Sequence, residues 1–192
     1  MNVAVYSGSF NPLPIGHLAI IKHMIEVAGF DMVYLIVSPK NPLKDGISSA
    51  SGTDRYNAAV EAVKRHFGTP ATTGTCRIKV DDIEMNMPEP HYTIHTLKAL
   101  RKREPENSFT LIMGADNLAS IRKWKDYQSI LTDFGIAAFP RKGYEMASLK
   151  QALLSENSTY KISLLEAPLV TISSTEIREA LKRGEDTSQF MM

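Results

Sequence analysis

Residues 1–29 read MNVAVYSGSFNPLPIGHLAIIKHMIEVAG and predict a short strand, a loop with glycine and proline, and a helix in direct succession. The strand is expected at Val3–Tyr6, which is apolar without interruption, as in a sheet covered on both faces. After the loop, apolar residues from Leu18 to Ala28 recur at helical spacing, and Gly29 is well placed to end the helix. A strand that leads into a helix is the opening unit of an α/β fold.

The same alternation continues along the chain. Further strands are expected at Met32–Val37, Arg77–Val80, Phe109–Met113, Gly135–Phe139 and Tyr160–Leu165. Helices are expected at Thr53–Phe67 and Thr93–Arg103, and a last helix opens at the capping box Ser173–Glu176, with Gly184 after it. This order predicts a single α/β domain with a doubly wound, Rossmann-like and mostly parallel sheet that is flanked by helices.

Composition restricts the classes of partner. The 22 Lys and Arg residues nearly balance the 21 Asp and Glu residues, which argues against a nucleic acid polymer as partner. No apolar run approaches the roughly 20 residues that cross a membrane, and the N-terminus lacks the pattern of a signal peptide. The one cysteine cannot form an internal disulfide. A cytoplasmic protein without a membrane partner is the expectation.

In doubly wound sheets, ligands bind outside the carboxyl ends of the strands. The loop Ser7–Leu18, after the first strand, is neither a Walker A loop nor a GxGxxG motif. It does contain Gly8, where backbone can approach a ligand, and His17 in the first turn of a helix, where phosphate groups are attracted. The alternative interpretation is a tight turn followed by a half-exposed histidine.

Two further strand ends carry candidate ligand contacts. Lys44, in the loop after the second strand, could meet a polyphosphate as a point charge, or it could be an ordinary solvated lysine. After the fourth strand, Gly114 permits close approach of a ligand and Asp116 can accept hydrogen bonds from ribose hydroxyls. Trp124, the only tryptophan, is a candidate shelf for a ligand ring, or a core residue.

The last strand is followed by Thr171–Arg178, where hydroxyls, free N–H groups and Arg178 would form a second phosphate cradle. The alternative is a helix cap with no ligand. His91 and His95 are four residues apart, but His91 is expected to precede the helix, and no cysteine or paired carboxylate completes a metal site. We therefore expect no metal ion held by the chain alone.

Together these motifs resemble the HxGH nucleotidylyltransferase superfamily. Its G-x-F-x-P-x-H-x-G-H loop aligns with residues 8–17, and its I-S-S-T-x-I-R helix start with residues 172–178. Residues 38–44, 92–97 and 114–124 resemble one branch, the bacterial nicotinate-nucleotide adenylyltransferases. The resemblance implies that residues 1–192 form one nucleotidylyltransferase domain. It would join ATP and nicotinate mononucleotide, with Mg²⁺, to give the dinucleotide and pyrophosphate. A homo-oligomer is left open.

The resemblance also implies roles for residues at matching positions. The catalytic residues would be His17, Lys44 and Arg178. ATP would contact Gly8, Ser9, Phe10, Gly16, His17, Gly114, Asp116, Ile172, Ser173, Ser174 and Arg178. The mononucleotide would contact Lys44, Thr93 and Trp124, with the indole face stacked on the cationic pyridinium ring.

One departure bears on activity. The first histidine of the family loop is replaced by Pro14, which is expected at the first helical position, where its missing N–H costs nothing. Losing one positioned donor typically lowers a rate by about 10²–10³. This departure leaves open a working but atypical enzyme or a nucleotide-binding paralogue with weak turnover. Transfer to nicotinamide mononucleotide or phosphopantetheine is a separate alternative. Trp124 and the stretch Tyr92–Leu97 favour a pyridine nucleotide over phosphopantetheine.

Overall fold

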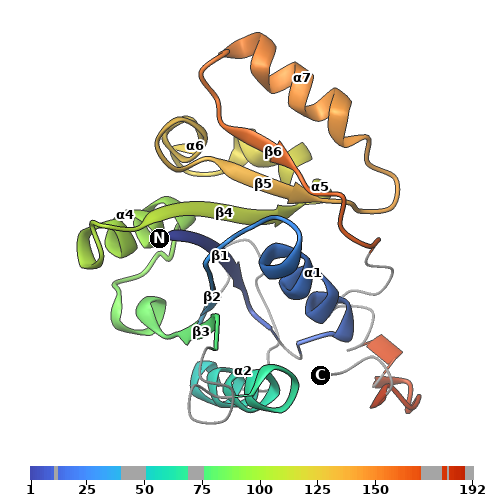
Figure 1. Ribbon diagram of the computed structural model, residues 1–192. Coiled ribbons are helices and arrows are strands. Elements are labelled where there is room, and N and C mark those ends of the chain that lie inside the picture. Colours follow the sequence, from blue (N-terminus) through green and yellow to red (C-terminus); the bar gives the residue numbers. More distant parts are fainter. Residues whose placement is uncertain (11–12, 40–50, 69–75, 170–178, 181, 189–192) are drawn as a thin grey trace.

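The computed structural model describes residues 1–10, 13–39, 51–68, 76–169, 179–180 and 182–188. Six strands form one sheet in the order β3-β2-β1-β4-β5-β6, and every neighbouring pair is parallel (Figure 1). Their bounds are β1 Asn2–Gly8, β2 Met32–Val37, β3 Ile78–Asp81, β4 Ser108–Gly114, β5 Ile136–Phe139 and β6 Ile162–Leu164. All six expected strands are confirmed, with ends that differ by at most two residues.

Helices cover both faces of this sheet, as the doubly wound prediction requires. They are α1 Ile15–Glu26, α2 Gly52–Phe67, α4 Thr93–Arg103, α5 Ala115–Ala119, α6 Tyr127–Ser129 and α7 Met146–Glu156. Short turns of other helix types lie at η1 Ile83–Asn86, η2 Ile121–Lys123 and η3 Ile130–Phe134. No helix in the described part of the chain is long and apolar enough to cross a membrane.

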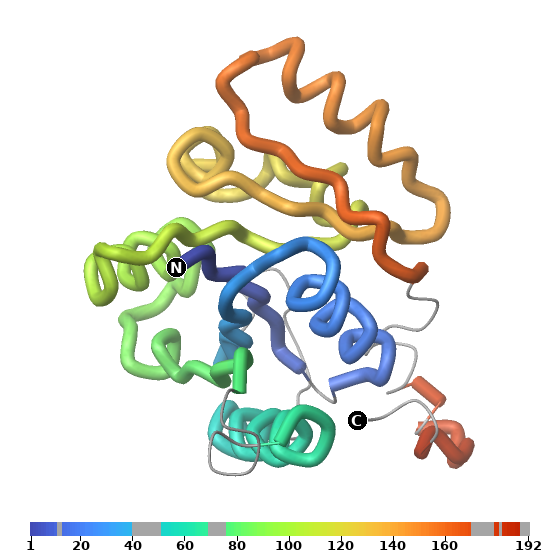
Figure 2. The backbone as a smooth tube through the Cα atoms, viewed as in Figure 1, coloured from blue at the N-terminus to red at the C-terminus, as the bar shows by residue number. Residues whose placement is uncertain are grey.

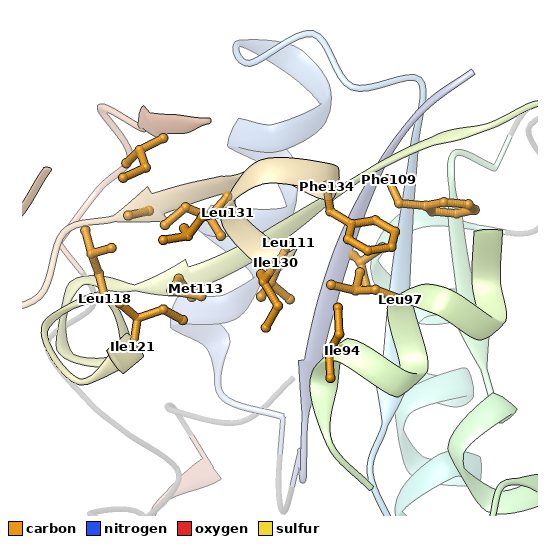
Figure 3. Packing of buried hydrophobic residues seen from close by; sticks show 14 of the residues in the cluster. Ile94, Leu97, Phe109, Leu111, Met113, Leu118, Ile121, Ile130, Leu131 and Phe134 are labelled. Carbon is orange, nitrogen blue, oxygen red and sulfur yellow. The ribbon is translucent and has the colours of Figure 1, made fainter. Parts of the chain in front are cut away.

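The core has two layers because alternate strand residues point to opposite faces. On one face Ala4, Leu35 and Ala137 pack against α1 and α2. On the other face Val5 and Leu111 pack against α4, α5, η3 and α7. Figure 3 shows Ile94 and Leu97 of α4 directed toward the side chains of η3 and β4, with Phe134 and Phe109 beside them.

The strand order places the switch in chain direction between β1 and β4, which lie side by side at the centre of the sheet (Figure 2). From β1 the chain proceeds outward through β2 to β3, and it then returns to β4 on the other side of β1. Ligands of doubly wound sheets bind at the carboxyl ends of the strands at this switch. The fold therefore directs attention to the residues after Gly8 and Gly114.

Two features of the helices differ from the sequence predictions. Pro14 is the N-cap of α1 rather than its first helical residue, and its carbonyl oxygen accepts a hydrogen bond from the His17 N–H at 2.9 Å. Helix α7 and the short helices α5 and α6 were not predicted. Helix α7 buries only Leu153 fully, because its sequence lacks a strong apolar stripe. The predicted capping box at Ser173–Glu176 lies outside the described residues.

Helix α4 is tied to the end of β3 by a buried carboxylate, that of Asp81, which is 2% exposed. Arg103 Nη1 and Nη2 donate to its two oxygens at 3.1 and 2.6 Å, and Lys79 Nζ lies 3.0 Å from Oδ2. Burial acts to raise the pKa of Asp81, but the hydrogen bonds from Arg103 and Lys79 outweigh it and lower the pKa below its usual range. This cluster fixes the C-terminal end of α4.

Asp81→Asn is expected to lower the free energy of unfolding at neutral pH by about 2 kcal/mol, because hydrogen bonds to charged groups contribute about 1.5–3 kcal/mol each. A carboxyl with a lowered folded-state pKa stabilises the protein above its unfolded pKa of about 3.9. That contribution is lost as the pH falls through the folded-state pKa. Urea denaturation of both proteins from neutral to acid pH measures the effect. A difference in stability that stayed constant over this range would contradict the assignment.

Candidate active site

A cavity of about 470 Å³ lies at the predicted place, between the carboxyl ends of β1 and β4. Its volume is within the range of small-molecule sites. It brings together eight of the candidate residues, namely Gly8, Ser9, Phe10, His17, Thr93, Gly114, Asp116 and Trp124. These residues come from four separate stretches of the chain. The cavity therefore assembles what the sequence presents only as isolated strand-end motifs.

The loop after β1 packs tightly on itself. Phe10 adopts a positive φ of 43°, and its side chain turns back toward the end of β1. A Cβ added at Gly8 would lie 3.2 Å from Phe10 Cε1, so this position favours a residue without a side chain. Arg55 of α2, itself 4% exposed, donates to the carbonyl oxygen of Ser9 at 2.7 Å. The backbone of this loop is thus held close to the cavity by packing and by a buried guanidinium.

His17 is the third residue of α1 and is 9% exposed, so the half-exposed alternative is wrong. Its ring lies among aromatic rings, with centroids 5.4 Å from Tyr6 and 5.9 Å from Phe10. Burial, with a smaller contribution from the positive charge of Arg141, lowers the pKa of His17 to about 3. The imidazole is therefore neutral at physiological pH. Its Nδ1 has no hydrogen-bond partner among the described residues.

Gly114, Asp116 and Arg141 meet on the β4 side of the cavity. Gly114 is the N-cap of α5, Asp116 lies in the first turn, and Arg141 follows β5. Arg141 Nε lies 3.6 Å from Asp116 Oδ1, and neither atom has a hydrogen-bond partner in the described residues. The guanidinium also lies over the Phe139 ring, 5.3 Å from its centroid. An anionic or hydroxyl-bearing ligand could use both groups.

Sequence reasoning missed Arg141. The sequence position of Arg141 could have indicated it, because Arg141 lies two residues after the end of β5. Ligands bind at the carboxyl ends of parallel strands, and β5 is one of them. Glu84 was also missed, although it lines the cavity from η1. No local pattern marks a carboxylate that becomes buried only when distant elements pack around it.

Other lining residues of the cavity come from the start of α4 and from the segment after η2. Thr93 is the first residue of α4, and Tyr92 is its N-cap. Trp124 is partly buried and packs against the core cluster that includes Ile121. Lys123 and Lys125, its neighbours in the sequence, also line the cavity. An aromatic side chain and cations in one cavity suit a ligand that is both flat and anionic.

Several predicted site residues are not placed in this cavity. Gly16 is described, lies in α1 and is not one of the cavity-lining residues. The remaining ones lie outside the described residues, namely Lys44, Ile172, Ser173, Ser174 and Arg178. Within the described ranges, no group of three or more His, Cys, Asp or Glu side chains could hold a metal ion. As predicted, His91 precedes α4.

Comparisons with known proteins agree on one family. The cytidylyltransferase-like family model matches residues 5–180. The "Probable nicotinate-nucleotide adenylyltransferase" of Flavobacterium johnsoniae is 36% identical over 191 residues, which cover 100% of this chain and 92% of that protein. The protein of the same name from Flavobacterium psychrophilum is 38% identical over 191 residues, with the same coverage.

Solved structures agree on the fold. The chain superposes on Plasmodium falciparum nicotinic acid mononucleotide adenylyltransferase complexed with NaAD with a TM-score of 0.78 and 17% identity. The match covers 99% of this chain and 90% of that one. The chain is a member of the cytidylyltransferase-like family, and within it of the nicotinate-nucleotide adenylyltransferases.

Proposed function

We propose that this protein transfers the adenylyl group of ATP to the phosphate of nicotinate mononucleotide, giving nicotinate adenine dinucleotide and pyrophosphate. The observation that carries the proposal is the cavity at the switch between β1 and β4, because its lining includes both the loop after β1 with His17 and the aromatic side chain of Trp124. Full-length similarity to proteins named for this reaction supports it. The reaction is a step of NAD biosynthesis.

We assign the two substrates to two different sets of residues in the cavity, called its ATP half and its mononucleotide half. The half formed by Gly8–Phe10, His17, Gly114, Asp116 and Arg141 would take ATP, and the half with Thr93 and Trp124 would take the mononucleotide. The mononucleotide phosphate would attack the α-phosphorus in line as pyrophosphate leaves. A phosphate nucleophile is already anionic, so no general base is needed. Catalysis then depends on positioning and on stabilising charge in the transition state.

His17 would act in this step as a neutral hydrogen-bond donor to the α-phosphate. Because its pKa is lowered to about 3, the imidazole keeps one N–H to donate without carrying a positive charge. In a buried site a fixed donor is worth more than in water, because it needs no reorganisation as the charge shifts. Lys44 and Arg178 remain predicted holders of the departing pyrophosphate.

Magnesium would enter with the triphosphate. Mg²⁺ keeps several waters and binds through substrate phosphates with one or two protein carboxylates at most. Asp116 Oδ1, which accepts no hydrogen bond from the described residues and lies in a residue that lines the cavity, is a compatible ligand atom. When bound, the ion would neutralise charge on the phosphates.

Pyrophosphate release tests the proposal most simply. Purified protein with ATP and Mg²⁺ is given nicotinate mononucleotide, nicotinamide mononucleotide or phosphopantetheine in parallel. We expect the highest kcat/KM with nicotinate mononucleotide. Release only with another acceptor would keep the reaction class but overturn the substrate. ATP binding without release in any reaction would support the paralogue with weak turnover.

Gly114→Ala is expected to raise the KM for ATP about 10-fold, because an added Cβ would lie 2.3 Å from Asp116 Oδ1 and 3.0 Å from Arg141 Nε. Both side chains would have to leave their positions in the cavity. Ser108→Ala is the control on the same strand, since Ser108 is the exposed first residue of β4 and does not line the cavity. An unchanged KM for ATP in Gly114→Ala would remove Asp116 and Arg141 from the ATP half.

Pro14 favours one alternative, an enzyme whose turnover is weakened by a missing donor. Its φ of −71° and ψ of 151° are ordinary extended backbone, so the backbone at this N-cap position is compatible with histidine. Pro14→His is therefore expected to raise kcat at least about 10-fold, part of the 10²–10³ that a positioned donor provides. Steady-state kinetics at saturating substrates measures it. An unchanged kcat would mean that the present site does not need this donor.

A further inference from the structure

Glu84 is a buried carboxylate in the wall of the cavity, and the proposed mechanism does not use it. It lies in η1 and is 2% exposed. Ser38 Oγ donates to its Oε2 at 2.5 Å, and Thr96 Oγ1 donates to its Oε1 at 2.7 Å. In the described part of the chain it has no ion pair with a lysine, arginine or histidine. A carboxylate kept in such a place by two hydroxyls requires an explanation, because its desolvation is costly.

The two hydroxyls that donate to Glu84 come from different structural elements, the end of β2 and helix α4. Ser38 follows the last residue of β2 and lines the cavity. Thr96 lies on α4, three residues after Thr93, so both threonines share one face of the helix. Glu84 therefore bridges the end of β2 and the first turn of the helix that presents Thr93 and Tyr92 to the cavity.

Ser38 is also held by hydrogen bonds with residues other than Glu84. Arg55 Nη1 donates to the Ser38 carbonyl oxygen at 2.6 Å, and Nη2 donates to the Pro39 carbonyl oxygen at 2.7 Å. The Ser7 and Ser38 hydroxyls lie 3.4 Å apart, which joins the ends of β1 and β2. Ser38 is therefore fixed by several hydrogen bonds at the end of the sheet. By bonding to both Ser38 and Thr96, the Glu84 carboxylate connects the start of α4 to this fixed part of the protein.

The other end of α4 has its own attachment. Arg103, in the last turn, pairs with Asp81 at the end of β3, and the middle of the helix is anchored by Leu97 and Leu100 in the core. Loss of the Glu84 bridge should therefore shift the start of α4 while the rest of the helix stays packed. The start of α4 is the part that faces the mononucleotide half.

The hydrogen bonds to both Glu84 oxygens also reduce the repulsion between this carboxylate and an anionic ligand. An ionised carboxylate in the wall of a cavity for phosphate compounds would repel them. Each oxygen of Glu84 already accepts a short hydrogen bond from a hydroxyl, and these bonds direct its charge into the protein. A ligand role for Glu84 is thus disfavoured, and a positioning role fits both its burial and its bonds.

We propose that Glu84 is a positioning residue, which sets the mononucleotide half of the site by bridging Ser38 and Thr96. This inference rests on the proposed function, since the affected substrate is the mononucleotide. It does not require Glu84 to touch substrate. It predicts a selective effect on one KM, which a general loss of stability would not produce.

The test removes one hydroxyl at a time. Thr96→Val and Ser38→Ala are each expected to raise the KM for nicotinate mononucleotide about 10-fold, with the KM for ATP changed by less than about twofold. Glu84→Gln should stay within about threefold of wild type, because an amide can accept from one hydroxyl and donate to the other. Glu84→Ala should show the full effect, so the conservative variant would restore function that the truncation loses.

Leu100→Val is the matched control on the same helix, since it trims a fully buried core side chain and leaves all three polar groups in place. It should lower the melting temperature without changing either KM. The proposal is overturned if Thr96→Val or Ser38→Ala leaves the mononucleotide KM unchanged, or raises both KM values equally. Failure of the proposed function would look different, because wild-type protein would then release no pyrophosphate with nicotinate mononucleotide.

Discussion

His17→Ala is expected to lower kcat about 100- to 1000-fold, with a much smaller change in the KM of either substrate. The reason is that a donor fixed in a buried pocket stabilises the transition state more than the bound substrates. His17 is held among the rings of Tyr6 and Phe10, so water cannot easily replace its N–H in the same geometry. Steady-state kinetics with saturating ATP and nicotinate mononucleotide gives the result.

His23→Ala is the matched control, since His23 lies on the same helix and does not line the cavity. The pH profile adds a second readout. With the pKa of His17 lowered to about 3, kcat should show no loss from protonation of this residue as the pH falls from 8 to 5. Full turnover in His17→Ala, or a wild-type acid limb near pH 6.5 that the substitution abolishes, would contradict the role given to a neutral His17.

Trp124→Ala is expected to raise the KM for nicotinate mononucleotide about 30-fold and to leave the KM for ATP within about twofold. Stacking of an indole on a cationic ring in a partly desolvated site contributes about 2 kcal/mol, which corresponds to this factor. Trp124→Phe should recover most of the affinity, since phenyl keeps an aromatic face. Equal effects on both substrates would instead indicate that Trp124 only supports the core cluster that it contacts.

Direct binding offers an independent check on this residue. Trp124 is the only tryptophan of the chain, so intrinsic fluorescence reports on its surroundings alone. Nicotinate mononucleotide should quench the emission with a saturable dependence on concentration. An emission that does not respond to saturating mononucleotide would place the nicotinate ring away from the indole.

The fold could be predicted because its signals are local. Uninterrupted apolar runs such as Met32–Val37 mark strands covered on both faces, and the bounds of α4 follow from its apolar stripe. Helix α7 was missed because it buries few residues, and its sequence therefore shows only a weak apolar pattern. β1 and β4 are longer than their apolar runs because hydrogen bonding to neighbouring strands continues at their ends. β6 is shorter than predicted, because its pairing with β5 spans only Ile162–Leu164.

The site could be predicted only where a motif lies in one stretch of chain. The loop with Gly8 and His17 and the pair Gly114 and Asp116 qualify, and the cavity brings them together. The neutrality of His17 could not be predicted, because it depends on burial and on Arg141, which is far away in the sequence. The bridge made by Glu84 likewise joins segments that are separate along the chain.

The most direct test of adenylyl transfer is ³¹P NMR of the complete reaction. ATP, nicotinate mononucleotide, Mg²⁺ and a small amount of protein are followed until the mononucleotide is consumed. The account predicts that one pyrophosphate and one dinucleotide diphosphate appear for each mononucleotide phosphate lost. Appearance of ADP or of inorganic phosphate as the primary product, without the dinucleotide signal, would contradict it.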